Sequence, residues 1–94
     1  MRLSKEMIDF FKDIVSNISQ EAKVYLFGSR VDDKKKGGDI DLLVISQNIT
    51  KKHLRKIRVE FYKRFGEQKL DIVLDDGSLK DPFVKIIKNE AILL

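Results

Sequence analysis

The hydrophobic residues of the chain follow two helical patterns. In each pattern apolar side chains recur at spacings of three and four, which places them on one side of an α-helix. The first pattern predicts a helix over residues 5–19 with Ser4 as its N-cap. The second predicts a long helix that starts at Asn48 or Thr50 and ends before Gly66. The apolar positions are Met7, Phe10, Phe11, Ile14, Val15 and Ile18 in the first helix, and Leu54, Ile57, Phe61 and Phe65 in the second.

Shorter segments between and after these helices have the composition of β-strands. The predicted strands are residues 22–27, 39–45 and 69–75. The strand at 39–45 has apolar residues on both faces beyond Asp41, which places it in the middle of a sheet. Asp81 predicts the N-cap of a last helix over residues 82–89, followed by an extended tail. The order of elements predicts a single domain of the α/β (α+β) class, with a small mixed three-stranded sheet and helices packed on it.

Composition narrows the class of protein without identifying it. The 94 residues are 43% hydrophobic and 36% charged, which suits one compact domain. Cysteine is absent, so disulfides, thiolate nucleophiles and zinc knuckles are excluded. No apolar run approaches the roughly 20 residues that span a bilayer, and we therefore expect a cytoplasmic protein without a membrane partner. The net charge of +4 alone decides nothing.

Three aspartates are the first candidates for chemistry. Asp39 and Asp41 lie two apart in a predicted strand, so both side chains leave the same face with Cα atoms about 7 Å apart. Their repulsion costs about 2 kcal/mol at an effective dielectric near 20, and a divalent cation such as Mg²⁺ or Mn²⁺ removes it. Asp71 can lie beside Asp41 if the second and third strands are neighbours. The alternative is a charged strand end that faces solvent.

The second candidate is the turn after the first strand. Gly28 and Ser29 lie where a strand ends, a position at which backbone N–H groups can bind an anion, and Arg30 adds a cation with two parallel donors. The alternative is an ordinary turn tripeptide. The spacing fits neither the P-loop nor the glycine pattern of dinucleotide-binding folds, so both classes are excluded.

The combination of turn and aspartates is more specific than either part. The stretches VYLFGSR and GDIDLLV, with a later aspartate at Asp71, resemble the nucleotidyltransferase superfamily that includes DNA polymerase β. The similarity is closest to the minimal nucleotidyltransferase (MNT) proteins and extends over most of the chain. It implies the nucleotidyltransferase fold and transfer of AMP from ATP. It also implies a HEPN-domain toxin as partner, because MNT proteins are commonly the antitoxins of such toxins and modify a toxin tyrosine.

The resemblance also implies roles for individual residues. Asp39 and Asp41 would ligate two Mg²⁺ ions, with Mn²⁺ as an alternative metal. Asp71 would complete the site of the ion that lowers the pKa of the acceptor hydroxyl, and would help to take the proton of that hydroxyl. Gly28 and Ser29 would hold the β and γ phosphates of ATP.

Arg30 would steady the departing pyrophosphate. The lysine run Lys34, Lys35 and Lys36 either binds triphosphate or forms a solvated loop. His53 is expected at the surface.

Two other functions remain open at this point. The same fold can act as a non-catalytic antitoxin that neutralises the toxin by direct binding, with idle carboxylates. A small basic nucleic-acid binder is the third possibility. We do not expect nucleic acid as a partner, because three carboxylates would repel a phosphate backbone in the absence of metal.

Overall fold

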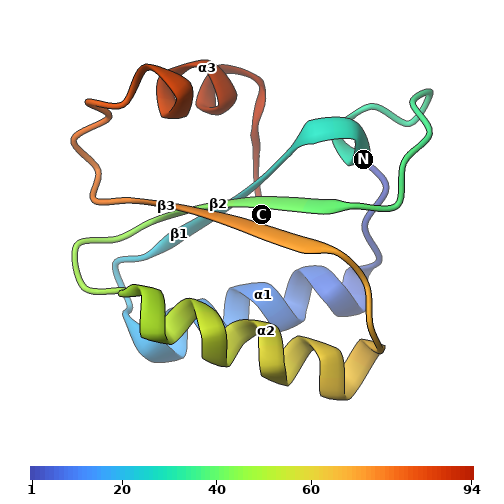
Figure 1. Ribbon diagram of the computed structural model, residues 1–94, viewed down its shortest axis with the longest axis horizontal. Helices are drawn as coiled ribbons and strands as arrows, with labels where there is room; N and C mark the ends of the chain where they lie inside the picture. Colours follow the sequence, from blue (N-terminus) through green and yellow to red (C-terminus); the bar gives the residue numbers. More distant parts are fainter.

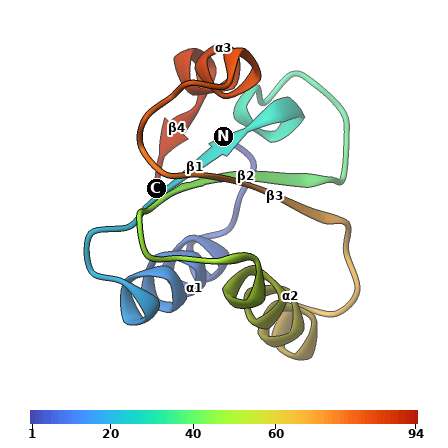
Figure 2. The same cartoon turned by 60° about the vertical axis from the view of Figure 1, so that its left-hand side comes forward.

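The computed structural model describes residues 1–94 as three layers, with α1 and α2 on one face of a four-stranded sheet and α3 on the other (Figure 1). The view in Figure 2, turned by 60°, shows the same separation. The elements in chain order are α1 (Lys5–Ile18), β1 (Lys23–Phe27), the short 3₁₀ helix η1 (Gly28–Val31), β2 (Ile40–Ile45), α2 (Lys51–Phe65), β3 (Leu70–Asp75), α3 (Pro82–Glu90) and β4 (Ile92–Leu93). None of the helices is long and apolar enough to cross a membrane.

The sheet is mixed, as predicted, and its strands lie in the order β3-β2-β1-β4. Strand β1 runs antiparallel to β2 and β4, whereas β2 and β3 are parallel. The predicted number of three strands is wrong, because the tail pairs with the outer edge of β1. Leu93 lies opposite Tyr25, and the N–H of Leu94 donates to the carbonyl of Val24 over 3.0 Å. This pairing satisfies backbone groups of β1 that would otherwise remain at a free edge.

Side chains cap the three helices at their first turns. The hydroxyl of Ser4 accepts a hydrogen bond from the N–H of Met7 over 3.2 Å, and Asp81 accepts one from the N–H of Phe83 over 2.9 Å. Thr50, not Asn48, is the N-cap of α2. Nδ1 of His53 accepts a hydrogen bond from the N–H of Thr50 over 3.0 Å, so the histidine belongs to the cap.

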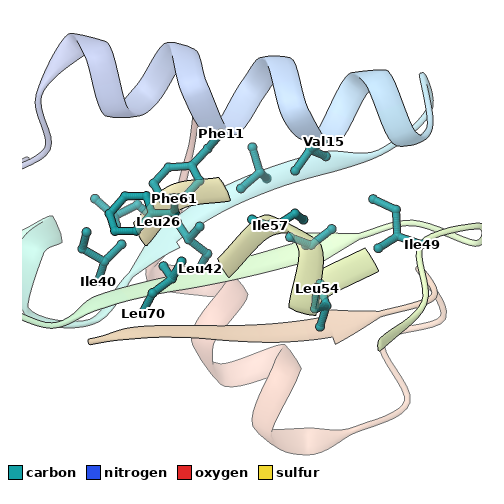
Figure 3. Packing of buried hydrophobic residues seen from close by; sticks show 12 residues of the cluster. Phe11, Val15, Leu26, Ile40, Leu42, Ile49, Leu54, Ile57, Phe61 and Leu70 are labelled. Carbon is teal, nitrogen blue, oxygen red and sulfur yellow. The ribbon is translucent and has the colours of Figure 1, made fainter. Parts of the chain in front are cut away.

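The hydrophobic core lies between the sheet and the pair α1 and α2 (Figure 3). Phe11 and Phe61 are fully buried and stack with ring centroids 5.3 Å apart. Complete burial of such a side chain contributes about 3 kcal/mol. The twelve residues of this cluster are Phe11, Val15, Val24, Leu26, Ile40, Leu42, Val44, Ile49, Leu54, Ile57, Phe61 and Leu70.

The opposite face of the sheet has a thinner cover. Helix α3 has nine residues, and among them only Val84 is buried. Phe83 and Ile86 of the same helix remain 52% and 67% exposed. The ammonium of Lys88 lies over the ring of Tyr25, 5.6 Å from its centroid, and so links α3 to β1.

Candidate active site

The end of β1 and the beginnings of β2 and β3 meet at one edge of the sheet. Because β1 is antiparallel to β2, its last residue, Phe27, lies opposite Asp41. Because β2 is parallel to β3, Asp71 lies opposite Asp41 on the other side. The turn at Gly28 and the aspartates of two strands are therefore neighbours, although the sequence separates them by up to 43 positions.

Asp41 and Asp71 occupy the thinly covered face of the sheet. Side chains of a strand alternate between its two faces. Ile40, Leu42 and Leu70 belong to the core cluster on the side of α1 and α2. Asp41 and Asp71 therefore point to the side of α3, next to each other, as expected for neighbouring strands.

The electrostatics of this edge favour a cation. Burial raises the pKa of Asp41, and the nearby negative charges of Asp71 and Asp39 raise it further. Lys69 partly offsets this repulsion. Its ammonium lies 3.6 Å from Oδ2 of Asp39 and 4.0 Å from Oδ2 of Asp71. A single positive charge thus already lies between two of the three carboxylates.

Lys69 is absent from the candidates found in the sequence. The available signal was its position directly before β3 and two residues from Asp71, which puts both on one side of the extended chain. The missing information was the register of β3 against β2, which brings Asp39 within reach of the same lysine.

The donor set fits a magnesium ion that shares its ligands with a substrate. Asp39, Asp41 and Asp71 offer hard carboxylate oxygens, which Mg²⁺ prefers. They do not form a closed group of three protein ligands by themselves. Mg²⁺ is usually bound by one or two carboxylates together with phosphate oxygens of the substrate, so an open arrangement suits it.

Gly28 allows the turn to pass directly beside Asp41. Its φ is +80°, a conformation that residues with side chains rarely adopt. A Cβ atom at this position would lie 2.3 Å from Oδ2 of Asp41. Glycine is therefore required twice here, by the backbone conformation and by the contact with the carboxylate.

The loop that follows folds back over Ser29. A Cβ atom on Gly37 would lie 2.6 Å from the hydroxyl oxygen of Ser29, so the backbone of Gly37 passes next to that side chain. Ser29 is partly buried by this contact. The next residues along the chain, Gly38 and Asp39, lead directly into β2.

Arg30 is bound to backbone carbonyls. Its Nη2 and Nε donate to the carbonyl of Gly38 over 3.0 and 3.3 Å, and its Nη1 donates to the carbonyl of Arg2 over 2.6 Å. Arg2 in turn donates from Nη2 to the carbonyl of Gly37 over 2.9 Å. The two arginines hold the backbone immediately before Asp39.

Arg2 gave no signal in the sequence, because it lies outside every periodic segment. The role of Arg30 toward pyrophosphate stays a prediction, and its contacts give it a second role in holding the loop. Lys34, Lys35 and Lys36 are exposed, and their role toward triphosphate also stays a prediction.

The sheet order brings the glycine turn and the adjacent aspartates together at one end of β1, β2 and β3. The model of the nucleotidyltransferase domain family, which is DNA polymerase β-like, matches residues 5–94, and the chain belongs to this family. The mixed sheet with three helices is consistent with the nucleotidyltransferase fold. No curated protein matches the chain significantly. Family membership supports nucleotidyl transfer as the general reaction.

Proposed function

We propose that this protein is a Mg²⁺-dependent adenylyltransferase that transfers AMP from ATP to a tyrosine hydroxyl of a HEPN-domain toxin and so acts as its antitoxin. The observation that carries the proposal is the contact of Gly28 with Asp41, which has Asp71 as its cross-strand neighbour. This arrangement joins a turn suited to phosphate with a cluster suited to metal. The choice of ATP and of the toxin rests on the resemblance of the segments around Gly28 and Asp41 to MNT proteins.

In this proposal the aspartates hold the metal and handle the proton. Asp39 and Asp41 would hold two Mg²⁺ ions, and Asp71 would complete the site of one ion and accept the proton of the acceptor hydroxyl. When bound, the metal neutralises the charge of the triphosphate and lowers the pKa of the acceptor hydroxyl. Burial and the neighbouring charges of Asp71 and Asp39 raise the pKa of Asp41, and a bound cation would offset both effects, which supports this assignment.

The turn and its loop hold the nucleotide in line with the acceptor. Backbone N–H groups at Gly28 and the hydroxyl of Ser29 bind the β and γ phosphates. The acceptor oxygen bonds to the α-phosphorus, and pyrophosphate leaves with the bridging oxygen. Alignment and charge stabilisation supply most of the catalysis in such a transfer.

The exposure of the site supports a macromolecular acceptor. The side chains of Asp39 and Asp71 are 52% and 51% exposed, so a residue on the surface of another protein can reach them. A cavity of about 460 Å³ lies instead near the opposite ends of β2 and β3, where Ser46 and Asp75 contribute to its lining.

The test is the intact mass of the protein that co-purifies with this chain, before and after incubation with Mg²⁺ and ATP. We expect a gain of one or more AMP units on the partner. The double variant Asp39→Asn with Asp41→Asn should produce no gain. The double variant Asp9→Asn with Asp13→Asn removes the same charge from exposed positions of α1 and should retain full transfer.

Two outcomes would change the proposal. If the Asp39 and Asp41 variant still transfers AMP, the assignment of the site is wrong. If the unmodified protein transfers nothing but forms a stable complex that neutralises the partner, the non-catalytic antitoxin replaces the enzyme.

A further inference from the structure

Positive charge is concentrated on one helix. The 15 residues of α2 include seven Lys and Arg residues against one Glu, an excess of six positive charges. The whole chain has an excess of only four, so everything outside α2 is acidic by two charges. Helix α1, which packs on the same face of the sheet, has two lysines against three acidic residues. The basic character of the protein therefore belongs to α2 alone.

Two of the seven cations, both arginines, contact elements outside α2. Nε of Arg58 donates to the carbonyl of Leu70 over 3.3 Å. The guanidinium of Arg64 lies over the ring of Phe10 in α1, 5.9 Å from its centroid. These two arginines help to attach α2 to the rest of the fold.

Four of the other cations line the outer side of α2. Lys52, Lys56 and Lys63 follow one another at spacings of four and seven, which places them in a row about 16 Å long. Arg55 lies beside this row, and all four side chains are exposed. Lys63 alone has an acidic partner, Glu60, at 3.5 Å, and its side chain is still 70% exposed. We call these four residues the basic face.

We propose that the basic face binds the phosphate backbone of a nucleic acid. A row of like charges along one side of a helix complements the line of negative charges on a nucleic-acid backbone. Interfaces between proteins are usually poor in lysine and have an apolar centre, whereas the basic face surrounds a single exposed hydrophobic residue, Val59. Insertion into a lipid surface does not fit, because the apolar side of α2 is buried against the sheet.

The structure also removes the main argument against a nucleic-acid partner. That argument is the repulsion that three carboxylates would exert on the phosphates. Asp41 and Asp71 point to the α3 side of the sheet, whereas α2 lies on the other side (Figure 2). The sheet therefore separates the acidic cluster from the basic face, and a nucleic acid can bind α2 without approaching the aspartates.

The test measures fluorescence anisotropy of a labelled oligouridine of roughly 20 nucleotides with the full chain over a range of salt concentrations. Four phosphate contacts predict that log K falls with log salt with a slope of about −3 for a single strand, and nearer −4 for a DNA duplex. The same titration with a DNA duplex decides which nucleic acid is preferred. Absence of binding to both probes at low salt overturns the proposal.

A pair of variants with equal net charge locates the surface. The first changes the four residues of the basic face to Gln, and the second changes Lys34, Lys35, Lys36 and Lys85, all exposed and outside α2, to Gln. We expect the first to bind at least 100-fold more weakly in about 0.1 M salt and the second to lose much less. Equal loss in both variants overturns the proposal, because it shows attraction to the net charge alone.

Two controls keep the result decisive. Thermal unfolding of both variants checks the fold, and if the fourfold variant does not unfold cooperatively, Lys52→Gln and Lys56→Gln are tested singly. Each single change should weaken binding about fivefold. Polyglutamate is added as a competitor at the same charge concentration. If it displaces the oligonucleotide equally well, the surface recognises acidic polymers in general and the nucleic-acid assignment is wrong.

Discussion

The two faces of the sheet have different tasks. The face toward α1 and α2 carries the twelve-residue core, with Phe11 and Phe61 fully buried at its centre. The face toward α3 carries the aspartates and is covered by a helix that buries only Val84. Packing on the first face fixes the strands, and the strands fix the register that brings the aspartates together. Substitutions on the second face can therefore alter chemistry while the fold persists.

The largest effect should come from the first face. Phe61→Ala should destabilise the protein by about 4 kcal/mol, because it leaves a cavity where two phenylalanines stack. Val84→Ala, which empties the only buried position of α3, should cost about 2 kcal/mol. Urea denaturation of the two variants measures both values. Equal losses would contradict the division between the faces.

A smaller loss of stability, together with a large loss of AMP transfer, should come from a substitution in the turn at Gly28. Gly28→Ala places a methyl group on the carboxylate of Asp41 and forces an alanine to a φ of +80°. We expect a loss of about 3 kcal/mol and loss of AMP transfer. The control is Gly66→Ala, because Gly66 has a φ of +84° but no atom within 4 Å of the added Cβ.

The difference between these glycine variants isolates the contact with Asp41. Gly66→Ala should cost about 2 kcal/mol for the backbone alone, because φ +84° with ψ 178° is a conformation largely restricted to glycine, and should leave transfer unchanged. Equal stability losses in urea, with transfer retained in both, would show that the close approach of Gly28 to Asp41 has no importance.

The smallest effect should come from the charge of Asp41. The pKa of Asp41 is raised in the folded state, because burial disfavours the charged carboxylate. The folded protein is therefore stabilised when this carboxyl is protonated, and that stabilisation is lost as the pH rises through the folded pKa. Without metal, Asp41→Asn should therefore raise the melting temperature at neutral pH by about 3 °C. The gain should vanish in acid, where the wild-type carboxyl is protonated, and Mg²⁺ should stabilise the wild type more than the variant.

Thermal melts over a pH series, with and without Mg²⁺, check this. Asp9→Asn on the exposed side of α1 is the control and should change little. A variant at Asp41 that melts below the wild type at every pH would show that the carboxylate stabilises the apo fold.

Local patterns predicted most of the fold. The helices α1 and α2 follow from apolar residues at spacings of three and four, and β2 from an apolar run with turns on both sides. Strand β4 was missed because a two-residue strand has no period of its own and exists only through pairing with β1. The cap of α2 was left open between Asn48 and Thr50, since both are good capping residues.

The candidate site was partly predictable for the same reason. Asp39, Asp41 and the turn at Gly28 lie within 14 residues and form a recognisable local pattern. The contacts of Lys69 depend on the strand register, and those of Arg2 depend on the path of the loop. Neither the register nor the path can be predicted from the residues of these two segments. Glu21 is a similar case, because its carboxylate accepts hydrogen bonds from Ser46 and from the N–H of Gln47 across the β2–α2 connection.

The parallel pairing of β2 with β3 sets the order in which the site can form during folding. Strands β1 and β2 are consecutive in the chain and are joined by residues 28–39, so their pairing can bring Gly28 to Asp41 before β3 is in place. Asp71 is thirty positions further along the chain and arrives only after α2 has formed the crossover between the two parallel strands. A partly folded chain in which only β1 and β2 have paired has two of the three aspartates. The complete cluster is therefore present only in molecules in which β3 has paired with β2.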